Sequence, residues 1–439
     1  MKKLLSIFIS LAFIFLFTKT SFAFYDPRTT KNNIYGIHIV NFSDLTDSSE
    51  LVNTNGDWGY VTIVVTKDQM DKNVWQSFLD DCRRKHLIPI IRIATRYDGK
   101  NWEIPKIEEI DNWVNFLNSL NWVIENRYVV IGNEPNHAKE WGGTIDPKGY
   151  ATYLKTFSER LKNSNKDFFV LPAALDQDAP NSKLTMDEEK YLKEMNKSVP
   201  GIFNFIDGLN SHSYPNPGFS GSKTGSGRRS IKGYVWEMAI IKSFGVNEDL
   251  PIFITETGWI RNKKNESKIS ENLIYSFNEV WKKDRNVIAV TPFVLNYIQE
   301  PFKGFSFKID NNSYYPIFYD IKDQNKVKGE PKQLVSGEVV FNFLNPFVFK
   351  EKRIQGLTVV RNTGQAIWTK DNSSIKDEFE AKNIDIVSVN LNDIEPFKTG
   401  LVVYSLKPNT DGVLLDTKLG FFVLDKKIGD VFKGKIINF

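Results

Sequence analysis

The chain of 439 residues has one cysteine, Cys82, and four histidines. A single thiol cannot form an internal disulfide, and it cannot build a zinc site from cysteine ligands. Cys82 lies in the apolar-periodic stretch Val74 to Leu87, where we expect it to pack as a small core residue. No metal-ligand cluster and no nucleotide-binding loop is visible in the sequence. We therefore expect neither a metal nor a cofactor.

An apolar run that is short for a membrane span opens the chain. Lys2 and Lys3 precede the run Leu4 to Phe17, and Ser21-Phe22-Ala23 supplies small residues for signal peptidase. A membrane-spanning helix needs about 20 apolar residues. We therefore predict a signal peptide over residues 1–23, a secreted, extracytoplasmic protein and no stable membrane insertion. An uncleaved anchor is the alternative.

The sequence also lacks an excess of charge of either sign. The formal net charge is +4, and it falls to about +1 when Lys2, Lys3 and Lys19 leave with the signal peptide. This balance gives no electrostatic reason to expect nucleic acid or an anionic membrane as partner. The oligomeric state stays open.

Short apolar runs alternate with longer helical patterns from Tyr35 to about residue 330. The runs are nearly continuous in apolar residues, as expected for strands buried on both faces of a parallel sheet. Eight strands, each followed by a helix, predict an α/β fold of the (β/α)8 TIM-barrel type; no glycine-rich loop supports an open doubly wound sheet. The predicted strands are Tyr35–Val40, Tyr60–Val65, Ile88–Ile93, Tyr128–Gly132, Phe168–Ala173, Phe205–Asn210, Pro251–Thr255 and Val287–Leu295. The predicted helices include Val74–Lys85, Ile107–Leu120, one from Pro147 to about Asn163, one opened by a capping box over Thr185–Glu188, Ser230–Phe244, Ser270–Lys283 and Pro316–Gln324.

The pattern changes to an alternation of period two after about Gln333. Runs such as Leu357–Val360 and Gly400–Tyr404 are separated by turn residues, which is typical of antiparallel strands. We therefore predict a barrel over residues 24–334 and a small all-β sandwich over residues 335–439.

Two glutamates directly follow predicted barrel strands. Tyr128–Gly132 runs into Asn133-Glu134-Pro135, and Ile252–Thr255 runs into Glu256. The carboxyl ends of barrel strands form the face where barrel active sites are built. The spacing of the two glutamates matches three strand–helix units of roughly 40 residues each, which places them on the fourth and seventh strands.

A pair of carboxyl groups at one barrel mouth suits cleavage of a glycosidic bond with retention. One group protonates the leaving oxygen while the other attacks the anomeric carbon, with the two about 5–5.5 Å apart. The acid must be protonated before the attack, and a nearby ionised carboxylate favours that state by like-charge repulsion. Glu134 and Glu256 as members of structural ion pairs are the alternative.

The segments Gly132-Asn133-Glu134-Pro135-Asn136 and Thr255-Glu256-Thr257-Gly258-Trp259 resemble the clan of retaining (β/α)8-barrel glycoside hydrolases (clan GH-A). This clan includes cellulases, β-mannanases and β-xylosidases, and the resemblance covers residues 35 to about 330. It implies that Glu134 is the acid/base and Glu256 the nucleophile. Arg361-Asn362-Thr363-Gly364 followed by Trp368 resembles an immunoglobulin-like module appended to exported proteins.

The same resemblance implies supporting roles in substrate binding. Asn133 would hydrogen-bond the sugar 2-hydroxyl, and Arg92 would hold the nucleophile ionised. His212 and Tyr214 follow the sixth strand, where such enzymes place an imidazole or hydroxyl against the carboxylates. For Arg92 the alternative is a surface salt bridge, and for His212 and Tyr214 it is core packing.

For several further features the sequence does not decide whether they take part in substrate binding. His38 on the first strand is a second candidate imidazole, and Trp259 is a candidate ring for stacking on a sugar, as are Trp102 and Trp141. The clan frequently ends the eighth strand with a Trp, which is missing from Pro292–Tyr297. The glycine-rich segment Pro217–Lys232 follows the sixth strand and reads either as a lid or as a floppy tether.

The sequence therefore predicts a secreted retaining glycoside hydrolase that degrades a polysaccharide or oligosaccharide. One alternative is a catalytically silent barrel that binds glycans for adhesion or wall attachment. Another is a transglycosylase that uses the same carboxylate pair. The sugar, the linkage and endo or exo action depend on the loops around the barrel mouth.

Overall fold

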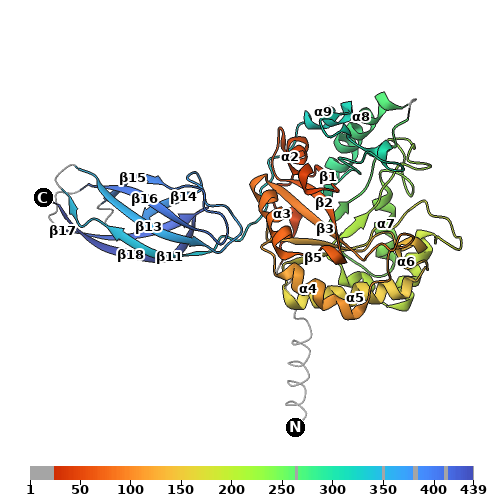
Figure 1. Ribbon diagram of the computed structural model, residues 1–439, viewed down its shortest axis with the longest axis horizontal. Helices are drawn as coiled ribbons and strands as arrows, with labels where there is room; N and C mark the ends of the chain where they lie inside the picture. Colours follow the sequence, from red (N-terminus) through yellow and green to blue (C-terminus); the bar gives the residue numbers. More distant parts are fainter. Residues whose placement is uncertain (1–23, 263–264, 349–351, 379–383, 410–413, 439) are drawn as a thin grey trace, which may run out of the picture.

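A computed structural model of the chain describes residues 24–262, 265–348, 352–378, 384–409 and 414–438. The predicted signal peptide, residues 1–23, lies outside this range. Among the helices that the structure describes, none is both long and apolar enough to span a bilayer. The described residues form two bodies, one of alternating strands and helices and one of strands alone (Figure 1).

Eight parallel strands build the first body. Five form one sheet in the order β1 to β5, and three form a second in the order β6 to β8. Nearly every residue in these strands is buried, because helices cover the outer face and the barrel core fills the inner one. The strands are β1 (Gly36–His38), β2 (Gly59–Thr66), β3 (Leu87–Ala94), β4 (Arg127–Ile131), β5 (Phe168–Pro172), β6 (Leu209–Ser211), β7 (Ile252–Ile254) and β8 (Val287–Val290).

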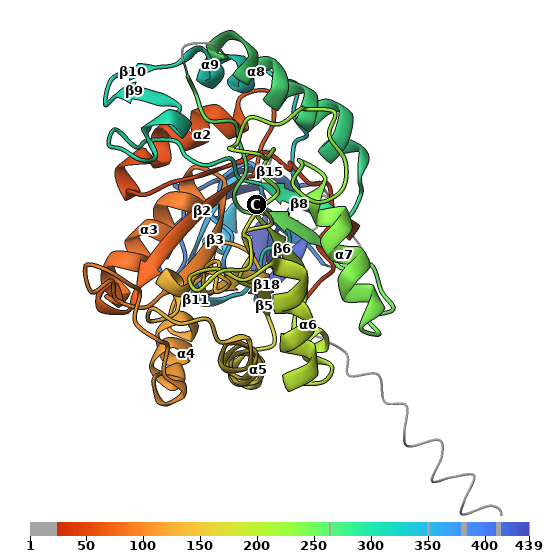
Figure 2. The same cartoon turned by 90° about the vertical axis from the view of Figure 1, so that its right-hand side faces the viewer.

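Hydrogen bonds at both seams close the two sheets into a barrel. Beside β8, the Val290 amide donates to the Ile34 carbonyl at 2.9 Å, and Tyr35 pairs with Val290 in a parallel bridge. At the other seam, the Asp207 amide donates to the Val170 carbonyl at 2.9 Å. Figure 2 shows the strands enclosed by a ring of helices. The predicted TIM barrel is confirmed.

The surrounding helices follow the strands in the chain. Apolar side chains on their inner faces join the barrel core, and Cys82 on α3 is fully buried there, as expected. The helix α2 was not among the predicted helices. Residues Thr46–Glu50 are all polar, so the sequence shows no helical spacing of apolar residues there. In the structure α2 buries Leu45, Ser48, Leu51 and Val52. The helices are α2 (Leu45–Asn53), α3 (Lys72–Arg84), α4 (Ile110–Asn118), α5 (Pro147–Ser164), α6 (Glu188–Ser198), α7 (Gly233–Ser243), α8 (Glu266–Tyr275) and α9 (Pro316–Lys322).

Three local predictions need correction. Residues Ile202–Phe205 form a 3-10 turn, so the sixth strand starts later than predicted and includes Ser211. The eighth strand ends at Val290 rather than Leu295. The capping box over Thr185–Glu188 is wrong, because Asp187 is the N-cap of α6 and accepts from the Lys190 amide.

The second body is a β-sandwich with its own core. One sheet has the order β11-β13-β16-β15 and the other the order β12-β18-β17-β14. Trp368 is fully buried between them, and Tyr404 and Phe421 belong to the same cluster. The strands are β11 (Gly337–Leu344), β12 (Phe347–Val348), β13 (Ile354–Asn362), β14 (Ser373–Asp377), β15 (Ile384–Asn390), β16 (Thr399–Pro408), β17 (Leu414–Val423) and β18 (Lys426–Asn438), and a short hairpin of β9 (Lys308–Asp310) and β10 (Ser313–Tyr314) belongs to the barrel.

The sandwich contacts the barrel at the end where the strands begin. The Gln365 side-chain amide donates to the Ile124 carbonyl at 2.9 Å, just before β4. An ion pair joins Arg84 at the end of α3 to Glu395 at 2.7 Å. The mouth at the carboxyl ends of the strands therefore stays uncovered by the sandwich (Figure 1).

We predict that the N-cap of α3 contributes measurably to stability. The Asp71 carboxylate accepts from the amides of Asn73 and Val74. Asp71→Ala should lower the free energy of unfolding by about 1 kcal/mol, because two amides lose their acceptor. Thermal or urea unfolding measures the change, and Lys72→Ala at the next, exposed position is the matched control. Equal effects of the two substitutions would contradict the capping role.

Candidate active site

Glu134 and Glu256 both lie at the carboxyl end of a barrel strand. Glu134 follows β4 after the turn residue Gly132, and Glu256 follows β7. Glu134 has φ of 32°, in the left-handed region that a residue with a Cβ rarely adopts. Its amide donates to the Ala174 carbonyl at 3.0 Å, which holds this conformation against the end of β5. Backbone strain of this kind concentrates at functional sites.

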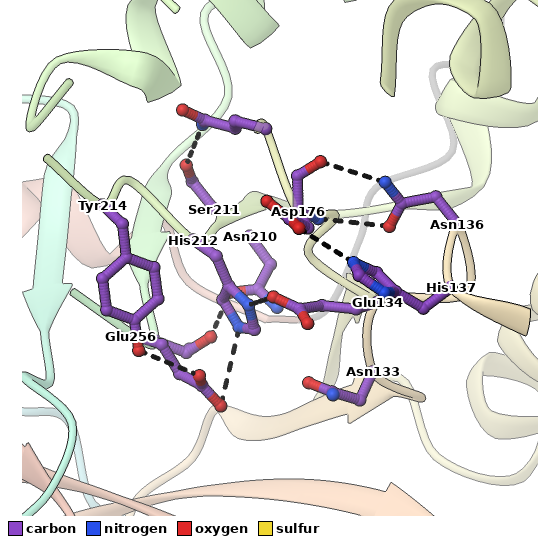
Figure 3. A network of polar contacts seen from close by, with 12 residues as sticks. Asn133, Glu134, Asn136, His137, Asp176, Asn210, Ser211, His212, Tyr214 and Glu256 are labelled. Carbon is purple, nitrogen blue, oxygen red and sulfur yellow. Dashed lines mark hydrogen bonds and ion pairs between the residues drawn. The ribbon is translucent and has the colours of Figure 1, made fainter. Parts of the chain in front are cut away.

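One imidazole lies between the two carboxylates (Figure 3). His212, just after β6, has Nδ1 at 2.7 Å from Oε1 of Glu134 and Nε2 at 3.9 Å from Oε1 of Glu256. The ring is 2% exposed, and within the described structure its Nε2 has no hydrogen-bond partner. His212 is therefore not a fully satisfied core histidine. Because His212 contacts both glutamates, its charge acts on both carboxyl groups.

Cationic and hydroxyl groups surround the Glu256 carboxylate. Arg92 on β3 donates to Oε1 at 2.5 Å, and the Tyr214 hydroxyl donates to Oε2 at 3.2 Å. Burial by itself would raise the pKa of Glu256, but the positive charges of His212 and Arg92 outweigh it and lower the pKa to about 2. The carboxylate is therefore ionised at neutral pH, as a nucleophile requires.

Arg92 also orients Asn133, the residue before the strained glutamate. The same guanidinium nitrogen donates to Oδ1 of Asn133 at 2.7 Å. Arg92 is not a surface salt bridge, because both members of its ion pair are 12% exposed. The structure thus brings together Arg92, Asn133, His212, Tyr214 and both glutamates at one mouth.

His38 lies beside Glu256 in the same site. Its Nε2 is 3.9 Å from Oε1 of Glu256, and the edge of its ring contacts Phe293 with centroids 5.2 Å apart. Burial and then the charge of Arg92 lower the pKa of His38 to about 3, so the ring is neutral at neutral pH. Phe293 is the half-buried ring beyond β8, in the segment where the predicted Trp is missing.

Trp259 is not placed to stack on a sugar. Its ring is 4% exposed and its Nε1 donates to the Gly221 carbonyl at 2.8 Å. The prediction of a substrate-binding ring is therefore wrong: Trp259 packs under the segment Pro217–Lys232. That segment is also no floppy tether, because Arg228 forms an ion pair with Asp187 at 2.5 Å and Arg229 forms one with Asp178 at 2.6 Å.

Three residues beside Glu134 were not predicted as part of the site. His137 forms an ion pair with Asp176 at 2.8 Å, and Asp176 lies in the loop after β5 (Figure 3). Glu140 lines a pocket together with Trp102 and Trp141, and burial followed by the charge of Glu134 raises its pKa to about 7. His137 and Glu140 could have been found from the sequence, because they lie only three and six positions after Glu134. Asp176 follows a different strand, so the sequence holds no comparable signal for it.

The part of the chain that the structure describes places no three His, Cys, Asp or Glu side chains as a metal site. The arrangement instead consists of one ionised carboxylate, a second carboxyl group and an imidazole that contacts both. Such a set can attack an electrophilic carbon and move a proton to and from a neighbouring oxygen.

We predict that His38 makes stability depend on pH. The unfolded side chain has a pKa of about 6.5, so between pH 6.5 and 3 the unfolded chain binds a proton that the folded chain does not. The contribution of His38 is fully present above pH 6.5, and it is lost as the pH falls, by up to about 1.4 kcal/mol per pH unit. Urea unfolding between pH 7 and 4 should therefore show a shallower loss for His38→Gln than for wild type. Parallel curves would contradict the buried, neutral state.

Comparison with known proteins gives matches among solved structures only. No family model matches the chain, and neither does any curated protein. An endo-β-1,4-glucanase from Xanthomonas axonopodis pv. citri is 13% identical with a TM-score of 0.45, over 66% of this chain and 98% of that one. A glucosidase from Croceicoccus marinus is 9% identical with a TM-score of 0.47, over 87% and 98%. Endo-glycoceramidase II from Rhodococcus sp. is 10% identical with a TM-score of 0.43, over 88% and 99%.

Proposed function

We propose that the protein is a retaining glycoside hydrolase that cleaves β-glycosidic bonds of a polysaccharide or oligosaccharide by double displacement. The observation that carries this proposal is the contact of one buried imidazole, His212, with both Glu134 and Glu256. The proposal includes export, which rests on the N-terminal residues 1–23 alone.

In the first half-reaction, Glu256 attacks the anomeric carbon. Its Oε forms a bond to that carbon while the bond from the carbon to the leaving oxygen breaks. Glu134 gives its proton to the leaving oxygen, so the aglycone departs as an alcohol. The product is a glycosyl ester on Glu256, and Glu134 is left as a carboxylate.

In the second half-reaction, water enters where the aglycone was. Glu134 takes a proton from this water as its oxygen attacks the anomeric carbon, and the ester bond to Glu256 breaks. Because the configuration inverts twice, the product keeps the original configuration. A sugar hydroxyl in place of water would make the same site a transglycosylase.

The neighbouring side chains have defined tasks in this scheme. Arg92 and Tyr214 keep Glu256 ionised and oriented before attack. Arg92 holds the carbonyl oxygen of Asn133 and the Asn133 side chain also hydrogen-bonds Glu140, and the amide group donates its other hydrogen to the sugar 2-hydroxyl. The Phe293 ring takes the place of the missing Trp as the apolar floor under the sugar.

The first test follows product masses for wild type, Glu256→Gln and Glu134→Gln on β-glucans, xylans, mannans, galactans and short oligosaccharides. We expect wild type to cleave at least one of them and both variants to lose activity by about a thousandfold or more, since each half-reaction needs both carboxyl groups. Binding by wild type without cleavage of any glycan would instead support the silent glycan-binding protein.

Retention itself is tested with azide as an external nucleophile. Azide should restore turnover of an activated aryl glycoside by Glu134→Ala with retained configuration, because Glu256 still forms the ester. With Glu256→Ala the azide product should be inverted, because azide attacks in place of the carboxylate. Products of equal configuration from both variants would exclude the assigned roles.

We also predict that Arg92 sets the acidic limit of activity. Without its charge, the pKa of Glu256 should rise from about 2, so a larger fraction of the nucleophile is protonated as the pH falls. Arg92→Met should therefore shift the acid limb of kcat/KM to higher pH and lower kcat/KM at pH 5 by about tenfold or more. The matched control is Arg96→Met, whose side chain is 64% exposed and pairs with Glu103. An unchanged acid limb in Arg92→Met would contradict this role.

A further inference from the structure

A second cavity lies between the barrel and the sandwich, at the opposite end of the barrel from the two glutamates. Its volume is about 460 Å³, within the range of about 300–1,000 Å³ that is usual for ligand sites. The segments before β4 and β5 line one side, and Leu334, Gln365 and Phe397 line the other. Both bodies therefore contribute to one concave surface.

Phe397 is exposed and strained at the edge of this cavity. Its side chain is 58% exposed and its φ is 62°, in the left-handed region. The Lys398 amide donates to the Glu395 carbonyl at 3.1 Å, so Phe397 is the third residue of a tight turn that begins with Glu395 and Pro396. Gly or Asn is favoured at such a position when φ is positive. A bulky ring here costs about 1–3 kcal/mol and gains little from burial, which indicates a role outside folding.

Charged side chains lie in the same cavity. Glu125, Arg127 and Asp167 line it and are half-buried. The Arg127 guanidinium donates to Oδ1 of Asn118 at 2.9 Å, while its buried Nε has no partner within the residues that the structure describes. Two carboxylates against one guanidinium disfavour phosphate, nucleic acid and acidic sugars.

We propose that this cavity is a second glycan-binding site, which takes a neutral sugar chain. A pyranose has an apolar C–H face that packs on an exposed aromatic ring, here Phe397. Its hydroxyls both donate and accept, so they can bind the carboxylates of Glu125 and Asp167 and the guanidinium of Arg127. The site holds a glycan without cleaving it and is independent of turnover at Glu134 and Glu256.

Affinity electrophoresis of the full chain tests this proposal. The parent protein carries Glu256→Gln to block turnover, and it migrates through gels that contain soluble β-glucan, xylan, mannan or galactan. We expect retardation in at least one of these gels, and about tenfold weaker binding when Phe397→Ala or Asp167→Asn is added. Phe343→Ala is the matched control, because this ring is 51% exposed on β11, away from the cavity. High salt should leave the retardation unchanged, since a neutral ligand is not screened.

Phe397→Gly separates binding from folding. Glycine accepts a positive φ without strain, so this variant should keep or raise the melting temperature while it loses glycan retardation. A fall in melting temperature with unchanged retardation would make Phe397 a structural residue and overturn the proposal. Absence of retardation for the parent, equal retardation of parent and Phe397→Ala, or an equal loss in Phe343→Ala would also overturn it. Hydrolysis of short oligosaccharides by the protein with Glu256 intact should be the same with and without Phe397→Ala.

Discussion

The ion pair of Arg92 with Glu256 is the interaction on which the candidate site depends. Burial alone raises the pKa of the Glu256 carboxyl group, which is 12% exposed, and so favours its neutral form. The guanidinium at 2.5 Å and the imidazole of His212 reverse that preference and keep the charge. An ionised group held out of water is a stronger nucleophile and interacts more strongly with its neighbours than the same group in solvent.

The barrel makes this arrangement possible because each member comes from a different strand. Arg92 lies on β3, Glu134 and Glu256 follow β4 and β7, and His212 follows β6. Parallel strands direct their carboxyl ends to one mouth, so side chains far apart in sequence meet there. The continuous apolar core beneath holds their backbones in place, and it compensates for the strained φ of Glu134.

The surroundings of the two glutamates differ in a way that suits two different tasks. Two cationic side chains and one hydroxyl group are directed at Glu256, whereas Glu134 contacts His212 and lies near the carboxyl group of Glu140. One site can provide a nucleophile and a proton donor at the same pH when its two carboxyl groups lie in different environments. The sandwich lies away from this site, because it contacts the barrel at the other end.

The pattern of apolar residues was enough to predict the barrel, the sandwich and the positions of Glu134 and Glu256, because buried parallel strands are continuous apolar runs and each glutamate directly follows one. The roles of Arg92 and His212 came only from the resemblance to the glycoside hydrolase clan, and the structure brings both side chains to Glu256. The burial of Trp259 could not be predicted from the sequence, since it depends on a distant loop whose Gly221 carbonyl accepts a hydrogen bond from the indole N–H. The tertiary structure also brought Asp176 and Glu140 beside Glu134 and placed Phe397 at a positive φ beside the barrel. Strand patterns report which face of an element is buried, whereas loop contacts arise from the packing of segments that no local pattern connects.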